Sequence, residues 1–298
     1  MKAYILNFLS THNYPEMAIS ELLRVYALLE KKEVFFRLLD DFYKETIDTE
    51  SQDGPIGCIS RELSVNFYTV KLLFYICLSK NLKIKYQKAG YSEAFFFENM
   101  TDLYCKTMEC YEVFGVWGIF ASGWFNSVFK MNTFTLGRLC YNIGSYRGEA
   151  FSIAKRKVEK NDRFISIHIP STPKPFDKAS RMQSYEMAYN FFKDVFKGRE
   201  PLFGCDSWLL YPPNKMLLSE KSNIVSFMED FRIVDSYEYN DDHILWRIFG
   251  KDYRASFDKL PRDSSLRKAY ADFIAQGNKT GAGIGFFVYD PINKTTLK

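Results

Sequence analysis

Two side chains with basic or nucleophilic chemistry lie near the ends of two predicted strands. His168 closes the stretch RFISIHIP at residues 163–170, and Cys205 opens the stretch CDSWLLY at residues 205–211. A histidine on the face opposite the isoleucines suits a general base, because its pKa is near neutral. If the two strands pair, Cys205 lies beside His168, and a cysteine activated by a histidine can form a covalent acyl intermediate. The alternatives are a histidine that satisfies a local hydrogen bond and a buried, unreactive thiol.

The segment that follows the histidine is polar and leads into a helix, as anion-binding loops do. Ser171, Thr172 and Lys174 offer two hydroxyls and an ammonium to a phosphate, and the helix start adds N–H groups and a favourable dipole. Within the stretch IPSTPKPFDK (169–178), Pro173 and Pro175 each remove a backbone donor from this loop, and the stretch contains no glycine. Asn223, in the later segment SNIVSF, either holds its own helix or contacts a cofactor. These four residues are the predicted cofactor-binding set.

Composition argues against several other functions. The six cysteines are scattered and form no C-x-x-C pair, and with three histidines in the chain we predict no metal site. Scattered thiols without a signal peptide favour the reducing cytoplasm. The 40 basic and 36 acidic residues give a net charge of +4, which is too balanced to indicate a nucleic-acid partner.

Two further segments have tempting alternative interpretations. Val113–Phe129 is 17 residues long and uncharged, but a membrane-spanning helix needs about 20 apolar residues. Its glycines, serines and asparagine favour a buried helix, so no membrane partner is predicted. The stretch GNKTGAGIG (277–285) follows a helix and precedes a strand, which reverses the order of a phosphate loop. We interpret it as a turn into the last strand.

The first 130 residues have the periodicity of helices. Apolar residues recur at helical spacing over 14–47, 60–78 and 92–112, with Ser60 and Ser92 as the predicted caps. SQDGPIG (51–57) is predicted to be a loop from its Gly, Pro and Asp content.

From Asn132 onward the composition becomes typical of strands joined by turns and helices. Asp177 or Ser180 caps the long helix that ends near Gly198, and Ser222 caps a short one. The predicted strands are 132–142, 149–155, 163–169, 205–211, 231–239, 244–249 and 283–289, with turns at 144–148 and at NDDH (240–243), and a last helix spans 266–274.

This order of strand, strand, strand, helix, strand, helix, strand, strand resembles the core of the GNAT acyltransferase fold. The segments LGRLCYN, ISIHIP, SYEMAYNFF, CDSWLLYPP, KSNIVSF and FGKDYRASFDKLPRDSSL further resemble a family of bacterial acyltransferases with a helical N-terminal part and a GNAT-like C-terminal domain. The resemblance covers nearly the full length. It implies an α+β protein with an α-helical domain at 1–130, followed at 131–298 by a mixed, mostly antiparallel sheet flanked by helices.

The resemblance also implies a function. It predicts an enzyme that transfers an acyl group from acetyl-coenzyme A or a longer acyl-coenzyme A to an amine of a small molecule or peptide. The pyrophosphate of coenzyme A would lie at 163–169 and 177–197, with the helical domain on the acceptor side. GNAT enzymes often carry a tyrosine acid in the short helix, where Met228 stands here. A non-catalytic binding protein that retains the fold is therefore the alternative.

Overall fold

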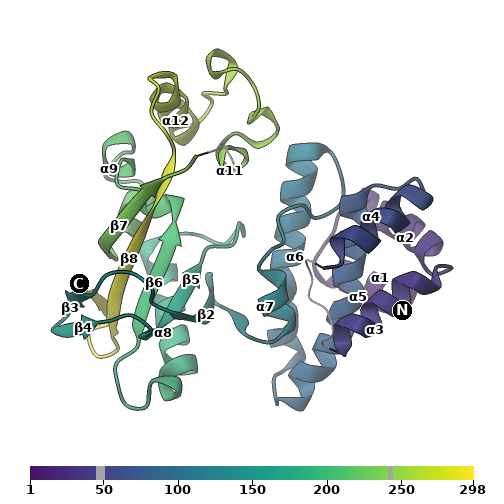
Figure 1. Cartoon of the computed structure of the whole chain (residues 1–298), viewed down its shortest axis with the longest axis horizontal. Helices are drawn as coiled ribbons and strands as arrows, with labels where there is room; N and C mark the ends of the chain where they lie inside the picture. Colours follow the sequence, from purple (N-terminus) through teal and green to yellow (C-terminus); the bar gives the residue numbers. More distant parts are fainter. Residues whose placement is uncertain (45–50, 241–243) are drawn as a thin grey trace. The chain divides into compact units, whose positions relative to one another are not determined.

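The computed structural model describes residues 1–44, 51–240 and 244–298. The chain divides into two compact units, Met1–Asn132 and Thr133–Lys298 (Figure 1). In the described residues of the first unit the regular structure is helical, whereas the second unit is built on a sheet with flanking helices. The predicted α+β class, with helices first and a mostly antiparallel mixed sheet second, is confirmed.

The first unit packs around one central helix, α5. This helix is buried on nearly every side between Thr69 and Ser79, as expected of a helix that is apolar all round and lies inside a bundle. The helices of the unit are α1 (Lys2–Thr11), α2 (Glu16–Leu29), α3 (Glu33–Tyr43), α4 (Asp53–Glu62), α5 (Phe67–Lys88), α6 (Glu93–Phe114) and α7 (Phe125–Phe129). All of the others contact α5.

Local rules explain both the confirmed and the wrong helix predictions. The periodicity over 14–47 corresponds to α2 and α3, with the part from residue 45 outside the described residues. Ser92 caps α6 by accepting the Phe95 N–H at 3.2 Å. The loop predicted at 51–57 is wrong, because α4 begins at Asp53 and tolerates a proline in its first turn. Ser60 therefore lies inside α4, and Asn66 caps α5 instead.

The buried helix predicted for Val113–Phe129 is also largely wrong. Gly115 adopts a left-handed conformation (φ 68°) and ends α6, and only α7 restores helical structure. Gly118 lies so close to Tyr68 that a Cβ would stand 2.5 Å from the Tyr68 carbonyl carbon. The chain after Gly115 therefore packs its backbone closely against α5 instead of continuing as a helix. Across the described residues, none of the helices combines the length and the apolar character needed to span a membrane.

The second unit contains a twisted mixed sheet with the strand order β1-β2-β5-β6-β8-β7 (Figure 1). Its members are β1 (Thr133–Leu136), β2 (Leu139–Ser145), β5 (Arg163–His168), β6 (Leu202–Ser207), β7 (Arg232–Glu238) and β8 (Gly281–Asp290), with β9 (Thr295–Leu297) paired to β8. The β5–β6 pair is parallel, and the other described pairs are antiparallel. The long helix α8 (Lys178–Phe192) connects the two parallel strands.

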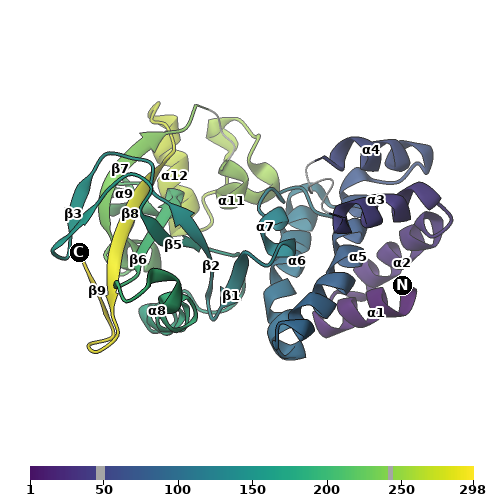
Figure 2. The ribbon, with the colours of Figure 1, turned by 60° about the horizontal axis from the view of Figure 1, so that its bottom comes forward.

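The two faces of this sheet are covered differently (Figure 2). On one face α8 packs through Tyr185, whose ring lies 6.1 Å from that of Phe203 on β6. On the other face lies the small hairpin β3 (Phe151–Ile153) and β4 (Arg156–Val158), packed on Phe286 and its neighbours. The remaining helices are α9 (Asn214–Leu217), α10 (Asn223–Met228), α11 (Leu245–Phe249) and α12 (Ser265–Ala275).

Several predicted strands need correction. The strand predicted at 132–142 is a hairpin whose two-residue turn begins at Gly137, which has a φ of +77° that favours glycine. The returning strand at 149–155 becomes β3, which pairs with β4 rather than with the main sheet. The strand at 244–249 is wrong, because this segment forms α11 and packs into an apolar cluster with α12. The predicted turn before it falls partly at 241–243, outside the described residues.

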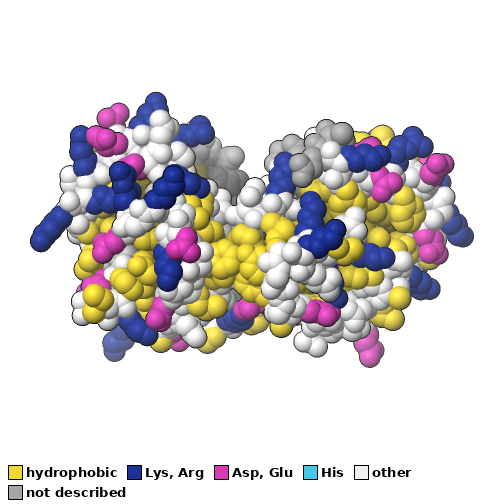
Figure 3. Space-filling model, turned by 90° about the horizontal axis from the view of Figure 1, so that it is seen from below, with side chains coloured by type: hydrophobic (Ala, Val, Ile, Leu, Met, Phe, Trp, Pro, Cys, Tyr) yellow, Lys and Arg dark blue, Asp and Glu magenta, His cyan; other side chains and the backbone are white. Residues whose placement is uncertain are grey.

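Basic side chains do not gather on the face of the molecule that Figure 3 shows. Lys and Arg are spread over both units and alternate with Asp and Glu. Proteins that bind nucleic acid through the phosphate backbone concentrate basic residues on one face or along one helix. The dispersed charge agrees with the balanced composition.

Candidate functional site

The sheet opens between its two parallel strands. The register between β5 and β6 covers Ile165↔Phe203 and Ser166↔Gly204. Beyond these pairs β5 continues beside β2 as far as His168, and β6 continues beside β8 as far as Ser207. The carboxyl ends of two central, parallel strands therefore frame an opening at one end of the sheet, where folds of this kind place ligands.

Alternation along the strands decides which side chains share a face at this opening. His168 follows Ser166 by two residues, and Asp206 follows Gly204 by two, so both lie on the face opposite α8. Glycine at 204 leaves room there for aromatic rings, since a Cβ would stand 2.4 Å from Phe286. The opening thus carries one imidazole and one carboxylate on the same face, one on each strand.

His168 is held as a neutral base. Its Nε2 lies 2.8 Å from Oδ1 of Asn142 on the neighbouring strand β2. With that oxygen as acceptor, Nε2 carries the proton and Nδ1 keeps its lone pair. The side chain reaches solvent, yet the protein atoms crowded around the ring desolvate it and lower the pKa of the imidazole. His168 is therefore able to accept a proton at neutral pH.

Cys205 lies in a different environment. Its side chain lies on the same face of β6 as that of Phe203 and points toward α8. Only 2% of the residue's surface is exposed. Burial raises the pKa of its thiol well above the usual value, which keeps the sulfur protonated. Although β5 and β6 do pair, the structure does not bring Cys205 and His168 together, because adjacent positions on paired strands lie on opposite faces. The geometry matches the alternative of a buried, unreactive thiol.

A tyrosine that the sequence did not single out completes the β6 side of the opening. Tyr237 on β7 donates its hydroxyl to Asp206, with Oη–Oδ1 and Oη–Oδ2 distances of 3.0 and 3.2 Å. Asp206 and Asp235 both pair with Ile284 on the strand between them. Burial, and secondarily the charge of Asp235, raises the pKa of Asp206, while the bond from Tyr237 works in the opposite direction. A strand-end aspartate was visible in the sequence, but its partner is 31 residues away.

The loop after β5 brings the predicted phosphate-contacting residues together. Ser171 and Lys174 are exposed, and Thr172 is half-buried with its Oγ1 accepting the Lys174 N–H at 3.3 Å. The Lys174 ammonium lies 3.4 Å from the carbonyl oxygen of Gly137 in the β1–β2 turn. A hydroxyl pair and an ammonium thus share one short exposed segment beside the opening.

The start of α8 is already occupied by a carboxylate. Asp177 is the cap, and its Oδ1 accepts the Ser180 N–H at 2.8 Å. The bonds from Ser180 hold the pKa of Asp177 below its usual value, so the group is ionised at neutral pH. Of the two caps predicted from the sequence, Asp177 is the one used. Because its negative charge sits at the helix start, an anion is better placed on the loop before it.

Asn223 lies apart from these groups. It is the first residue of α10, is exposed, and follows the cap Ser222, which accepts the Ile224 N–H at 3.2 Å. In the part of the chain that the structure describes, no hydrogen bond links Asn223 to His168 or to the loop. Nor do three His, Cys, Asp or Glu side chains meet there in a group able to hold a metal ion.

Two family models match the sequence. One is described as a GNAT-like C-terminal domain and matches residues 133–287, and the other as an N-acyltransferase N-terminal domain and matches residues 5–131. No curated protein matches the chain.

Several solved structures share the fold. An acyltransferase in complex with decanoyl-CoA and teicoplanin has a TM-score of 0.72 at 17% identity, covering 98% of this chain and 87% of that one. An acyltransferase with CoA and 10C-teicoplanin has a TM-score of 0.71 at 18% identity, covering 94% and 86%. A mutant acyltransferase with octanoyl-CoA has a TM-score of 0.70 at 17% identity, covering 98% and 87%.

Proposed function

The chain belongs to the protein family with a GNAT-like C-terminal domain, and we propose that it transfers an acyl group from acyl-coenzyme A to an amine of a small molecule or peptide. The observation that carries this proposal is the opening between β5 and β6, with a neutral histidine on one side and a carboxylate on the other. The similar acyltransferases bound to octanoyl- and decanoyl-CoA support a fatty acyl donor, and those bound to teicoplanin or 10C-teicoplanin support a small-molecule or peptide acceptor.

The acyl-coenzyme A donor would bind beside the carboxyl end of β5. Ser171, Thr172 and Lys174 would contact the pyrophosphate, because they form the exposed polar segment nearest the end of β5. The thioester would then lie in the opening, where backbone N–H groups at the diverging strand ends can polarise its carbonyl. Asn223 belongs to the proposed cofactor-binding set only if the coenzyme extends to the start of α10.

The chemistry requires a proton to leave the acceptor amine. His168 Nδ1 removes this proton as the amine nitrogen bonds to the acyl carbon and the carbon–sulfur bond breaks. The sulfur leaves as a thiolate and takes one proton, from the imidazolium or from water, so transfer to the neutral amine is proton-neutral. Asp206, oriented by Tyr237, faces the same side and attracts the acceptor as a protonated amine, which releases one proton to solvent before the neutral amine reacts.

Binding of the donor is the first test. Octanoyl-CoA at a concentration one hundred times its Kd should stabilise the protein by about 2.7 kcal/mol and raise the melting temperature by several degrees. Release of coenzyme A thiol in the presence of a panel of primary amines then measures turnover. A melting temperature unchanged by millimolar octanoyl- and acetyl-CoA would refute the proposal.

A non-catalytic binding protein that retains the fold is the second candidate function, favoured by Met228 on α10, where GNAT enzymes often carry a tyrosine acid, and by the absence of glycine from the loop. The same two measurements separate the candidates. Stabilisation by octanoyl-CoA without thiol release on any amine of the panel supports the binding protein. Stabilisation with amine-dependent release supports the enzyme.

A further inference from the structure

The loop at 170–176 keeps a defined shape without any glycine, and its carbonyl groups show how. Three of them accept hydrogen bonds from side chains of neighbouring elements. Arg138 Nη1 donates to the carbonyl oxygen of Pro170 at 3.0 Å, and Arg181 Nη1 donates to that of Phe176 at 3.0 Å. Ser180 Oγ donates to that of Pro175 at 2.8 Å. The loop is therefore held near both ends by a guanidinium.

The first guanidinium is fixed through the β1–β2 turn. Arg138 is only 7% exposed, and its guanidinium lies 4.9 Å from the centre of the Phe176 ring. Ser184 of α8 ties the turn to the helix, since its Oγ donates to the Leu136 carbonyl oxygen at 2.5 Å and accepts the Leu139 N–H at 3.2 Å. The turn that carries Arg138 therefore cannot shift independently of α8.

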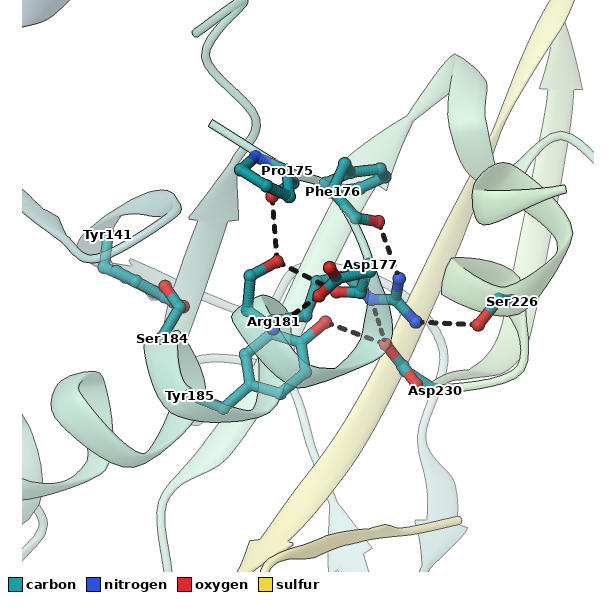
Figure 4. Close-up of polar contacts among 10 residues, drawn as sticks. Tyr141, Pro175, Phe176, Asp177, Arg181, Ser184, Tyr185, Ser226 and Asp230 are labelled. Atoms are coloured by element: carbon teal, nitrogen blue, oxygen red, sulfur yellow. Dashed lines mark hydrogen bonds and ion pairs between the residues drawn. The ribbon is translucent and has the colours of Figure 1, made fainter. Parts of the chain in front are cut away.

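The second guanidinium is fixed by a buried ion pair (Figure 4). Arg181 is fully buried, with its Nε 2.8 Å from Oδ2 of Asp230 and its Nη2 3.1 Å from Oγ of Ser226. Tyr185 donates its hydroxyl to the same aspartate oxygen at 3.1 Å. Such a network removes the rotational freedom of the guanidinium and compensates its charge, which a buried arginine requires.

The orientation of the peptide groups follows from these bonds. The carbonyl oxygens of Pro170 and Phe176 are directed at guanidinium groups and that of Pro175 at the Ser180 hydroxyl, so the N–H ends of these three peptide groups point the opposite way. Within the described residues, no backbone acceptor takes up the N–H groups of Ser171 or Phe176, which belong to two of these peptide groups. Outward N–H groups that have no backbone partner favour an anion.

We propose that Arg138 and Arg181 are positioning residues that hold the glycine-free loop 170–176 so that it receives the pyrophosphate of an acyl-coenzyme A donor. This inference rests on the proposed function and goes beyond it, because it assigns to two arginines the work that glycines do in other phosphate loops. Neither arginine needs to contact the donor itself.

The test compares two donors that differ in the pyrophosphate. Octanoyl-CoA contains it, and S-octanoylpantetheine ends before it. Isothermal titration of the full chain with each ligand is expected to show that Arg138→Met weakens binding of octanoyl-CoA at least about tenfold, the effect of losing one charge-assisted hydrogen bond. The affinity for S-octanoylpantetheine should stay within about twofold of wild type.

Matched variants separate positioning from general stability. Arg156 also donates to a backbone carbonyl, that of Glu200 at 2.8 Å, but lies in β4, so Arg156→Met should leave both affinities unchanged. Arg138→Lys keeps the charge without the planar fork and should give an intermediate loss. If Arg138→Met fails to fold, Arg138→Lys carries the test.

Three results would contradict these proposals. Equal affinity of wild type and the Arg138 variants for octanoyl-CoA would refute the positioning role while leaving the proposed function intact. Equal loss for both ligands would also refute it, because a general structural defect does not distinguish them. Wild-type protein that binds neither ligand would overturn the proposed function as well.

Discussion

The two strands that frame the opening end in groups with opposite properties. β5 ends at His168, whose imidazole has a lowered pKa and an amide partner on β2, and continues into a loop held by two arginines. Near the end of β6 lies Asp206, whose carboxyl group has a raised pKa and a tyrosine partner on β7. The difference separates a side suited to proton removal and phosphate binding from a side suited to receiving a cationic amine.

A second contrast lies within β6 itself. Cys205 and Asp206 are neighbours in sequence, yet one is buried against the α8 side and the other is exposed on the opposite face. Proximity along the chain is therefore a poor guide to the site, since alternation along a strand separates adjacent side chains. Variants at four positions test these contrasts.

Removing the base should have the largest effect. His168→Ala is expected to lower kcat by about a hundredfold to ten-thousandfold, the usual contribution of a positioned general base. The affinity for octanoyl-CoA should change little, as measured by titration. In wild type, kcat/KM should fall as pH drops through a pKa below 6.5, because protonation removes the basic form of His168, and this fall should be complete before neutral pH is reached from below.

The pH profile supplies the control for this variant. The acidic fall in kcat/KM should disappear in His168→Ala if the imidazole is the titrating group. An unchanged kcat, or an acidic fall that persists in the variant, would exclude His168 as the base.

Removing the carboxylate should have a smaller effect, which is restricted to the KM for the acceptor amine. Asp206→Asn is expected to raise the KM for an amine substrate about tenfold, while the KM for octanoyl-CoA stays the same. Tyr237→Phe should give a weaker change in the same direction, since it only loosens the carboxylate. Steady-state kinetics with each substrate varied in turn make the measurement, and an equal rise in both KM values would contradict the division between the two strands.

Removing the thiol should have the smallest effect. Cys205→Ala is expected to change turnover by less than about twofold and to lower the free energy of unfolding by about 1 kcal/mol, through lost packing. Denaturant unfolding and the thiol-release assay provide the two measurements. Loss of activity in a folded Cys205→Ala protein would instead support a covalent acyl intermediate.

Much of the fold was predictable because local physics dominates it. Alternating isoleucines indicated β5, helical spacing indicated α2, α3 and α8, and Ser92 and Ser222 cap the helices predicted from them. The resemblance to a family with a helical N-terminal part and a GNAT-like domain is likewise confirmed.

The failures occur where tertiary packing overrides local preference. The apolar run after α6 is broken by a left-handed glycine and by close packing on Tyr68, neither of which periodicity can register. The segment at 244–249 has strand-like composition but contributes to an apolar cluster with α12 and becomes helical. In both cases contacts distant in sequence decided the outcome.

The order of amino acids alone specifies which side chains occupy the end of β5 and, through the two-residue period, that His168 faces away from the isoleucines. It also placed a polar, glycine-free loop directly after that strand. The folded structure was needed to show that β5 and β6 diverge after Ser166, that Cys205 points away from His168, and that Tyr237 reaches Asp206. The faces of a strand follow from local geometry, whereas its register, its divergence from a neighbour and its side-chain partners depend on segments that folding brings together.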